Sequence, residues 1–377
     1  MTWIIVTLAF MAVYVLLMII ITWGWFRMPV YSGSADAGLK VSVIVPVRNE
    51  EQRLAALVND MMAQNYPKTD FELIFVDDHS DDRTRQVIHS FIEVFSWEGI
   101  HCISLADFPG KEGKKAAIET GIEKASGVLI ITTDADCRFP KTWLSAIAAY
   151  YQVHKPKIML APVRMDPGNS LFGSLQSLEF ASLVAASAGS ASAGFPLLAN
   201  GANLAFERDA FLQVGGYASN RQYSSGDDIF LLQSVRKQFG AKAVHYIKSQ
   251  PATVSTPALP GFKEFLNQRL RWVSKNKGYR DMNVLASGAL VYAVNALLPL
   301  LLVAGFFNGE AWKAAFIWYV VKMAIDFPVL VGVASFTGAG KTIVLIPFME
   351  ILNALYTAFI GIAGIFIPYE WKGRRCF

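Results

Sequence analysis

The stretch VSVIVPVRNE at residues 41–50 determines the fold class that we expect for this chain. Its first seven residues are mostly Val and Ile, which is typical of a strand buried on both faces. A helix-like stretch follows at residues 53–64, and FELIFVDD at 71–78 repeats the pattern with a helix-like stretch at 82–95. This order of strand, helix, strand and helix predicts an α/β domain with a mostly parallel sheet.

The pattern continues with a short strand at residues 101–105, a helix at 114–125 and the apolar stretch VLIITTD at 128–134. In parallel sheets, ligands bind beyond the carboxyl ends of the strands. Three polar stretches follow predicted strands here, and they are PVRNE (46–50), DDHSDD (77–82) and TDADC (133–137). We therefore expect a binding site at this edge. The Ala-, Ser- and Gly-rich stretch 170–194 predicts either a close-packed helix or a mobile lid.

The composition indicates a membrane protein. Of the 377 residues, 53% are hydrophobic and only 17% are charged, which is too apolar for a soluble chain of this length. Residues 3–26 contain no Asp, Glu, Lys, Arg or His, and three further apolar stretches occupy 284–307, 314–336 and 343–368. A cleaved signal peptide is the alternative for the first stretch. We expect a retained anchor, because no basic segment precedes the apolar stretch and no cleavage site follows it.

Four regions are expected: an N-terminal membrane anchor at 1–27, an α/β domain at 28–260, an interfacial segment at 261–283 and a membrane region with two or three helices at 284–377. Basic residues flank the α/β domain, which predicts a cytoplasmic location at a bacterial inner membrane. Because they gather beside apolar segments, we expect contact with lipid headgroups and no binding of nucleic acid. The three scattered cysteines predict neither a disulfide nor a zinc site.

Acidic residues are candidates for binding a metal ion and a nucleotide. Asp134 and Asp136 are separated by one residue after a buried strand, so both could bind a hard divalent cation that bridges a pyrophosphate. A turn or helix cap is the alternative. Asp78 could accept a hydrogen bond from the imide of a pyrimidine base, and this is compatible with helix capping by Asp82. Lys114 and Lys115, which follow a glycine at a helix start, lie either near phosphate or on the surface.

Seven blocks in order resemble the family-2 glycosyltransferases of GT-A fold, over roughly residues 40–272. They are VIVPVRNE (43–50), FELIFVDDHSDD (71–82), GKKAAI (113–118), ITTDADC (131–137), ANGANLAFERDAFLQVGGY (199–217), SSGDDIFLL (224–232) and QRLRW (268–272). Together with the apolar stretches, they are similar to the membrane-bound branch, which includes ceramide glucosyltransferases and the cellulose, chitin and hyaluronan synthases.

The resemblance implies an inverting enzyme that uses a nucleotide-sugar, expected to be a UDP-sugar. It also implies donor and metal contacts: Pro46 and Glu50 line the nucleotide pocket, Asp78 holds the base, Lys114 approaches the diphosphate, Asp134 and Asp136 bind Mg²⁺ or Mn²⁺, and Gly201 and Asn203 approach the donor sugar. A tight turn is the alternative for the segment with Gly201 and Asn203.

Two motifs remain for the acceptor side. Asp227 and Asp228 replace the last two residues of the branch's usual Thr-Glu-Asp, so the resemblance implies Asp228 as the general base and leaves the role of Asp227 open. A turn is the alternative. Gln268, Arg271 and Trp272 match the branch's Q-x-x-R-W motif. In that motif, the Arg contacts the diphosphate and the Trp forms the floor of the acceptor site. An interfacial anchor is the alternative for this motif.

These expectations define the predicted function as metal-dependent transfer of a sugar to a membrane lipid. A short processive polysaccharide synthase, which acts on a membrane-associated glycan, is the alternative. A non-catalytic nucleotide-sugar-binding subunit is a second alternative, against which the intact Asp134, Asp136, Asp228 and Arg271 argue. In the membrane part, Lys322 is expected to bind Asp326 or Glu350, because ionisable groups at membrane depth need partners.

Overall fold

The computed structural model describes residues 2–34, 38–223, 225–371 and 374–376. The chain forms two compact units that interleave along the sequence. We call Pro29–Asp166 with Leu198–Pro257 the α/β unit, and Met1–Met28 with Pro167–Leu197 and Ala258–Phe377 the helical unit. Each unit is described by itself.

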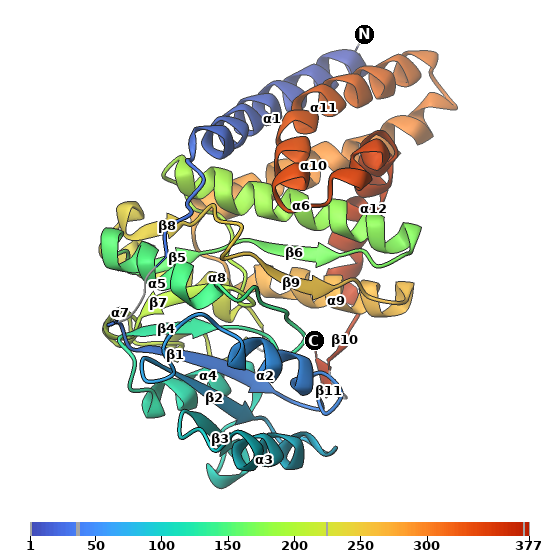
Figure 1. Cartoon of the computed structure of the whole chain (residues 1–377). Helices are drawn as coiled ribbons and strands as arrows, with labels where there is room; N and C mark the ends of the chain where they lie inside the picture. The colour runs from blue at the N-terminus through green and yellow to red at the C-terminus, as the bar shows by residue number, and fades with distance from the viewer. Residues whose placement is uncertain (1, 35–37, 224, 372–373, 377) are drawn as a thin grey trace. The chain divides into compact units, whose positions relative to one another are not determined.

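A seven-stranded sheet forms the centre of the α/β unit (Figure 1). Its strands in spatial order are β3 (Ile100–Ser104), β2 (Phe71–Asp77), β1 (Val41–Val47), β4 (Leu129–Thr132), β7 (Leu204–Glu207), β5 (Ile158–Leu160) and β8 (Val244–Tyr246). Only β7 runs antiparallel to its neighbours β4 and β5. The mostly parallel sheet confirms the predicted fold class.

The helices of the α/β unit follow the strands in the predicted order. They are α2 (Leu54–Met62), α3 (Thr84–Phe95), α4 (Gly113–Lys124), α5 (Trp143–His154), α7 (Arg208–Gln213) and α8 (Asp227–Phe239). The core is built from strand residues such as Val43, Ile44 and Val45, which are fully buried. A separate pair of parallel strands, β6 (Val163–Asp166) and β9 (Val254–Pro257), completes the unit.

The strand order reverses at β1, because β2 and β3 extend the sheet on one side of it and β4 on the other. Ligands of open α/β sheets bind at such a switch point, beyond the carboxyl ends of the strands. Val47 at the end of β1 pairs with Asp77 at the end of β2. The polar segments after these strands therefore lie side by side.

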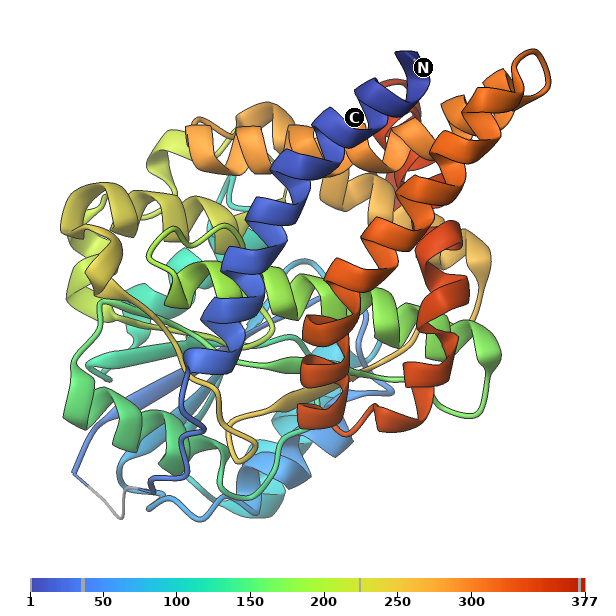
Figure 2. The ribbon, with the colours of Figure 1, turned by 90° about the horizontal axis from the view of Figure 1, so that it is seen from above.

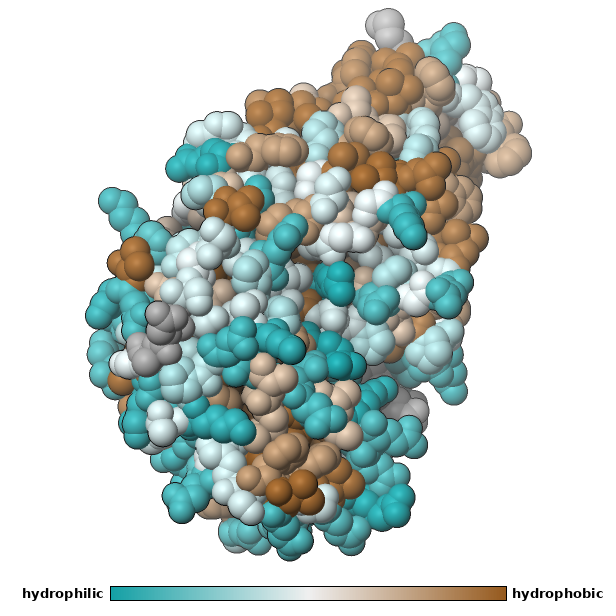
Figure 3. Space-filling view, viewed as in Figure 1, coloured by the Kyte–Doolittle hydropathy of each residue, from teal (hydrophilic) through white to brown (hydrophobic). Residues whose placement is uncertain are grey.

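The helical unit contains long apolar helices. Its elements are α1 (Thr2–Arg27), α6 (Leu171–Ser192), α9 (Phe262–Ser274), α10 (Met282–Gly305), α11 (Gly309–Phe336), α12 (Ile346–Phe366), β10 (Tyr369–Trp371) and β11 (Arg374–Cys376). Within the described residues, five helical segments are long and apolar enough to cross a membrane: α1, α6, α10, α11 and Gly340–Gly364. Figure 3 shows apolar surface over α1 and α11, where Leu16 and Phe316 are exposed.

The stretch 170–194 forms the helix α6, which crosses α1 in close contact (Figure 2). At the crossing, a Cβ atom on Gly24 would overlap the carbonyl oxygen of Gly189, and a Cβ on Gly189 would overlap the carbonyl oxygen of Ile21. Small residues let two helices approach to this distance. Of the two alternatives for this stretch, the structure has the close-packed helix.

A buried polar network connects three helices of this unit. On α11, Lys322 Nζ donates to Asp326 Oδ2 at 2.6 Å, and it also pairs with Glu350 on α12. The hydroxyl of Tyr14 on α1 donates to both oxygens of Asp326, at 2.9 and 2.8 Å. The predicted Lys322 network is confirmed, and it includes both carboxylates together with Tyr14.

Candidate functional site

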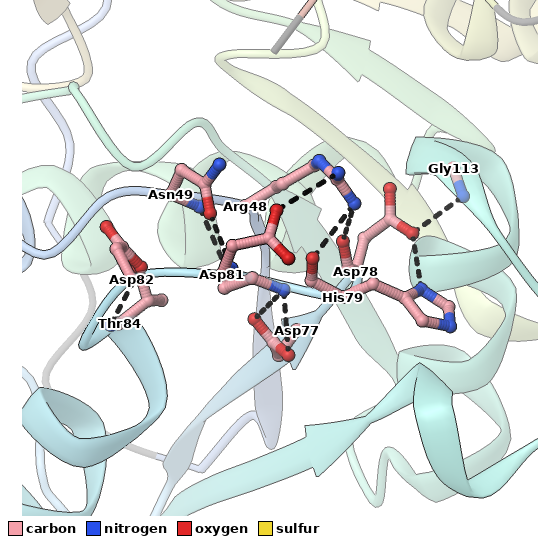
Figure 4. Close-up of polar contacts among 10 residues, drawn as sticks. Arg48, Asn49, Asp77, Asp78, His79, Asp81, Asp82, Thr84 and Gly113 are labelled. Carbon is pink, nitrogen blue, oxygen red and sulfur yellow. Dashed lines mark hydrogen bonds and ion pairs between the residues drawn. The ribbon is translucent and has the colours of Figure 1, made fainter. Parts of the chain in front are cut away.

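The segments after β1 and β2 are joined by reciprocal hydrogen bonds (Figure 4). The backbone N–H of Asn49 donates to Ser80 Oγ at 3.0 Å, and the N–H of Asp81 donates to Asn49 Oδ1 at 2.9 Å. The N–H of Glu50 donates to Thr84 Oγ1 at 2.8 Å, which brings the buried Glu50 to the start of α3. The two polar segments therefore form one ordered edge of the site.

Asp78 is fixed where β2, α4 and the β1 loop meet. Its side chain is buried, and Oδ1 accepts hydrogen bonds from the N–H of Gly113 at 3.0 Å and from the ring of His79 at 3.1 Å. Arg48 donates to the carbonyl oxygens of both Asp78 and His79, at 2.7 and 3.0 Å. Figure 4 shows the Asp78 carboxylate between the imidazole and Gly113. The carboxylate is thus held in one orientation.

Lys114 links the acidic segments that follow β4 and begin α8. Its Nζ lies 2.7 Å from Asp134 Oδ1 and 3.5 Å from Asp227 Oδ2. Burial by itself would lower the pKa of Lys114, but Asp134, Asp227 and Asp228 outweigh burial and raise it. The ammonium group therefore stays charged among three carboxylates at neutral pH.

Gly201 completes this cluster, because any side chain at its position would displace the ends of charged side chains. A Cβ atom there would lie 2.9 Å from Asp227 Oδ2 and 3.2 Å from Lys114 Nζ. The N–H of Gly201 donates to Asp228 Oδ2 at 3.3 Å, and its carbonyl accepts from Thr132 Oγ1 at 3.1 Å. The structure therefore brings together four segments far apart in sequence, which carry Lys114, Asp134, Gly201 and Asp227 with Asp228.

Asp227 and Asp228 occupy the first turn of α8, after Gly226 in the left-handed region at φ 87°. Negative side chains at a helix N-terminus are stabilised by the helix dipole. Oδ1 of Asp228 accepts from the N–H of Ile229 at 2.7 Å, while Asp228 remains partly exposed. Asp227 and Asp228 therefore lie in the turn that begins α8 and also belong to the carboxylate cluster around Lys114.

Besides Asp78, three predicted donor-side residues lie outside this cluster. Pro46 is on β1 beside Val76, and Glu50 accepts from Arg53 at 3.0 Å. The amide of Asn203 is 1% exposed, donates to Pro162 and Ala252 at 2.8 Å each, and accepts from Trp143 at 3.0 Å. Both amide hydrogens of Asn203 are therefore used to hold β7 against neighbouring loops.

Lys115 has different partners from its neighbour Lys114. Its Nζ donates to the carbonyl oxygens of Asn220 and Tyr223 at 2.8 Å each, and it lies 4.6 Å from the ring centre of Phe230. The segment that it holds leads directly into α8. Sequence patterns alone give both lysines the same interpretation, whereas the structure separates a site lysine from a lysine that binds this loop.

The Q-x-x-R-W residues Gln268, Arg271 and Trp272 lie on α9 in the helical unit, and all three are partly buried. The most buried member of the motif is Arg269, which sequence reasoning missed as a site residue and which is 2% exposed. It pairs with Glu179 on α6, which sequence reasoning also missed. No local pattern indicates this pair, since 90 residues separate its members.

The carboxylates fit a hard divalent cation in their chemistry. Asp134 and Asp136 are both partly exposed and supply oxygen ligands, which Mg²⁺ prefers. Within the described residues, no group of three or more His, Cys, Asp or Glu side chains is arranged to hold a metal ion. Magnesium commonly binds one or two carboxylates and completes its shell with water and substrate phosphates. Asp134 and Asp136 would hold a cation in this way.

Two family models match the sequence. The model described as Glycosyl transferase family 2 matches residues 42–211, and the one described as Glycosyl transferase family group 2 matches residues 129–333, more than half of the chain. The match to residues 129–333 includes the segments of Asp134, Gly201, Asp228 and the Q-x-x-R-W motif.

Individual relatives match over shorter lengths. The chain is 33% identical over 104 residues to glycosyltransferase AglE of Haloferax volcanii, covering 28% of this chain and 33% of the relative. It is 38% identical over 106 residues to an undecaprenyl-phosphate 4-deoxy-4-formamido-L-arabinose transferase of Aeromonas hydrophila, covering 26% and 30%. The matches thus span about a third of the length of these relatives.

A solved structure shares the fold over nearly the whole chain. It is the mannosyltransferase PcManGT from Pyrobaculum calidifontis in complex with GDP-Man and Mn²⁺, with a TM-score of 0.64 and 16% identity. The likeness covers 97% of this chain and 99% of that one. The likeness therefore includes the apolar helices as well as the sheet.

Proposed function

We propose that this chain, which belongs to the family described as Glycosyl transferase family group 2, transfers a sugar from a nucleotide-sugar to a membrane lipid. The observation that carries the proposal is the meeting of Lys114, Asp134, Asp227 and Asp228 around Gly201. A lysine with several carboxylates at the carboxyl ends of the strands of a parallel sheet suits a diphosphate that binds together with a divalent cation, since the cation offsets the negative charge of the carboxylates.

On the donor side, Asp78 binds the base and Lys114 contacts the diphosphate. The buried carboxylate of Asp78 accepts a hydrogen bond from the imide of uracil, so the donor is a UDP-sugar. Asp134 and Asp136 hold Mg²⁺ or Mn²⁺, which when bound stabilises negative charge on the departing diphosphate. The GDP-Man and Mn²⁺ in the mannosyltransferase structure of the same fold support a nucleotide-sugar donor and a divalent metal in general.

On the acceptor side, Asp228 acts as the general base for a hydroxyl acceptor. The acceptor oxygen attacks the anomeric carbon, the bond from that carbon to the diphosphate oxygen breaks, and the proton moves to Asp228. A single displacement inverts the anomeric carbon and needs no protein nucleophile. Gln268, Arg271 and Trp272 on α9 are assigned to the same reaction by the resemblance to the membrane-bound branch of family-2 glycosyltransferases, which includes both lipid glycosyltransferases and polysaccharide synthases.

The acceptor is a lipid that receives one sugar. Five helical segments long and apolar enough to cross a membrane support a membrane acceptor. The undecaprenyl-phosphate transferase among the relatives supports a lipid-linked one. The basic residues beside the apolar segments support a cytoplasmic α/β unit at the bacterial inner membrane.

The test uses the full chain in lipid nanodiscs with a panel of UDP- and GDP-sugars and Mg²⁺ or Mn²⁺. Release of nucleoside diphosphate identifies the donor, and extraction of labelled lipid identifies the product. One labelled sugar per lipid supports the proposal, whereas a ladder of polymer lengths or no release with any donor contradicts it.

Asp228→Asn tests the base separately. For a hydroxyl acceptor, we expect transfer to fall on the order of 10²- to 10⁴-fold, which is the usual contribution of general base catalysis. A lipid phosphate is already deprotonated at neutral pH and needs no base. An unchanged rate in Asp228→Asn would therefore reject the assigned role of Asp228 and indicate a phosphate acceptor.

A further inference from the structure

Gln176 on α6 binds the backbone just before the Q-x-x-R-W helix. Its Nε2 donates to the carbonyl oxygen of Leu259 at 2.9 Å, and its Oε1 accepts from the N–H of the same residue at 3.0 Å. The side chain is 1% exposed. The amide thus satisfies both polar groups of one backbone residue, three positions before α9 begins at Phe262.

Glu179 binds the same helix at a second point. Its Oε1 accepts from Arg269 Nε at 2.8 Å, and its Oε2 pairs with Arg269 Nη2. Two parallel bonds between a guanidinium and a carboxylate fix orientation as well as distance. Glu179 is 8% exposed and Arg269 2%, so the pair is shielded from solvent.

Arg269 in turn contacts two residues of the motif. It donates to Gln268 Oε1, and its guanidinium lies 4.1 Å from the ring centre of Trp272. The guanidinium also lies 4.4 Å from the ring centre of Phe265, one turn earlier on α9. The orientations of Gln268 and Trp272 are therefore tied to Glu179 through Arg269.

Gln176 and Glu179 lie three residues apart, so they share one face of α6. The N-terminus of α6 is capped by Ser170, whose Oγ accepts from the N–H of Gly173 at 2.8 Å. Near its other end, α6 is locked against α1 at Gly189. A helix fixed at both ends thus presents the two side chains that hold α9.

We propose that Gln176 and Glu179 are positioning residues for sugar transfer, because Gln176 holds the backbone that leads into α9 and Glu179 fixes Arg269 and through it Gln268 and Trp272. The inference rests on the proposed function, which assigns Gln268 and Trp272 to the reaction. A buried ion pair is commonly replaceable by apolar residues with no loss of stability. Its value here lies in orientation, which leucine and methionine side chains do not supply.

The experiment compares Glu179→Gln, the double variant Glu179→Leu with Arg269→Met, and Arg269→Lys in the full chain. Glu179→Gln leaves a buried charge unpaired and is expected to unfold at lower temperature than the wild type. The double variant is expected to recover the wild-type melting temperature. Its kcat nevertheless falls on the order of 100-fold, as for a small misplacement of reacting groups. The KM for the nucleotide-sugar changes less than about 2-fold, because the donor residues are intact.

Two further measurements make the outcome decisive. Hydrogen exchange of the α9 amides is expected to accelerate in the double variant, and Arg269→Lys is expected to recover only part of kcat, since lysine lacks the planar fork. Lys263→Met, at an exposed position of α9, is the control and is expected to match the wild type. Wild-type kcat in the double variant, or a kcat loss that only follows the loss of stability, overturns the inference.

Failure of the proposed function is a separate result. If the wild type releases no nucleoside diphosphate from any donor, the assignment to sugar transfer is wrong. The exchange measurement then still decides whether the pair holds α9, and unchanged exchange in the double variant would contradict the positioning role itself.

Discussion

The Nζ atom of Lys114 lies 2.7 Å from Oδ1 of Asp134, and this ion pair joins the start of α4 to the segment after β4. Lys114→Met removes the cation that the proposed function places beside the diphosphate. Hydrogen bonds to charged groups contribute about 1.5–3 kcal/mol, so affinity for the free nucleoside diphosphate should fall about 10- to 150-fold. Calorimetric titration with UDP and with GDP measures this change.

Lys124→Met is the matched control, because Lys124 is exposed at the end of the same helix. It should bind nucleotide as the wild type does. Equal affinity in Lys114→Met and Lys124→Met would show that Lys114 serves only to pair with Asp134 and Asp227.

Gly201 tests the geometry of the carboxylate cluster. The Cβ of Gly201→Ala would lie 2.9 Å from Asp227 Oδ2 and must displace that side chain. Transfer should fall on the order of 100-fold, as expected when reacting groups move by about 1 Å. Overpacking costs about 1–3 kcal/mol, so the variant should still fold. Steady-state kinetics with circular dichroism tests both expectations.

Gly288→Ala serves as the control for this variant. Gly288 lies on α10, where a Cβ atom would point into open space, and alanine favours a helix by about 0.5–1 kcal/mol. We expect normal transfer and equal or higher stability. Wild-type transfer in Gly201→Ala would mean that the cluster is not the reaction centre.

Strands and helices that have an apolar pattern within their own residues are predictable from the sequence. The apolar strands at 41–47 and 71–77 and the helices that follow them are found close to their expected places, because each has its own apolar period. The polar segments that follow these strands lie close together because the carboxyl ends of parallel strands lie at the same edge of the sheet. The long apolar stretches at the N- and C-terminal ends likewise form helices, as segments of that length predict.

Features that depend on distant partners are not predictable in this way. Gln176 and Glu179 interrupt the apolar pattern of α6, and their buried positions make sense only with Leu259 and Arg269, more than 80 residues later. Asn203 belongs to a sequence block that suggests a ligand contact. Its burial against three other segments follows from the tertiary fold.

His79 has a backbone conformation that favours glycine. Its φ of 56° lies in the left-handed region, and its ring contacts Asp78 at 3.1 Å. His79→Gly should be more stable than His79→Ala by about 1 kcal/mol, because alanine keeps the backbone strain. Both variants lose the ring, so both should bind UDP more weakly, by roughly 2- to 10-fold for one lost hydrogen bond.

Denaturant unfolding and UDP titration measure these two quantities separately. If the ring of His79 serves nucleotide binding, His79→Gly and His79→Ala should differ in unfolding free energy but should have the same weakened affinity for UDP. If both variants bind UDP as tightly as the wild type, the ring has no part in orienting Asp78.

Glu72 makes the α/β unit sensitive to acid. Burial by itself would raise its pKa, but hydrogen bonds from His101, Ser42 and Ser126 outweigh burial and lower the pKa from 4.5 to about 2. The stabilisation is fully present above pH 4.5 and is lost as the pH falls through about 2. Glu72→Gln should be less stable by roughly 2–3 kcal/mol at pH 7.

The difference in unfolding free energy between wild type and Glu72→Gln should narrow steadily below pH 4.5, because Glu72 of the unfolded chain then takes up a proton, and it should vanish below about pH 2, where Glu72 is neutral in the folded protein as well. Unfolding free energies at pH 7, 5 and 3 test this dependence. A difference that stays constant from pH 7 to pH 3 would mean that the carboxylate charge does not contribute.

Lys322 supplies the positive charge of the buried network that connects α1, α11 and α12. Lys322→Met leaves Asp326 and Glu350 buried without their cation, and breaking such a pair costs about 3–5 kcal/mol. Lys313→Met on the same helix removes only an exposed pair with Glu310, which contributes about 0–1 kcal/mol. Thermal unfolding in detergent should therefore separate the two variants clearly.

The triple variant with Lys322→Met, Asp326→Asn and Glu350→Gln carries no buried charge at these positions. It should recover most of the stability that Lys322→Met loses, because neutral side chains of similar shape avoid the cost of an unpaired charge. Affinity for free nucleotide should be the same in all these variants, since Lys322 lies in the helical unit and the proposed donor residues lie in the α/β unit. Equal melting temperatures for Lys322→Met and the wild type would mean that the network does not hold the three helices together.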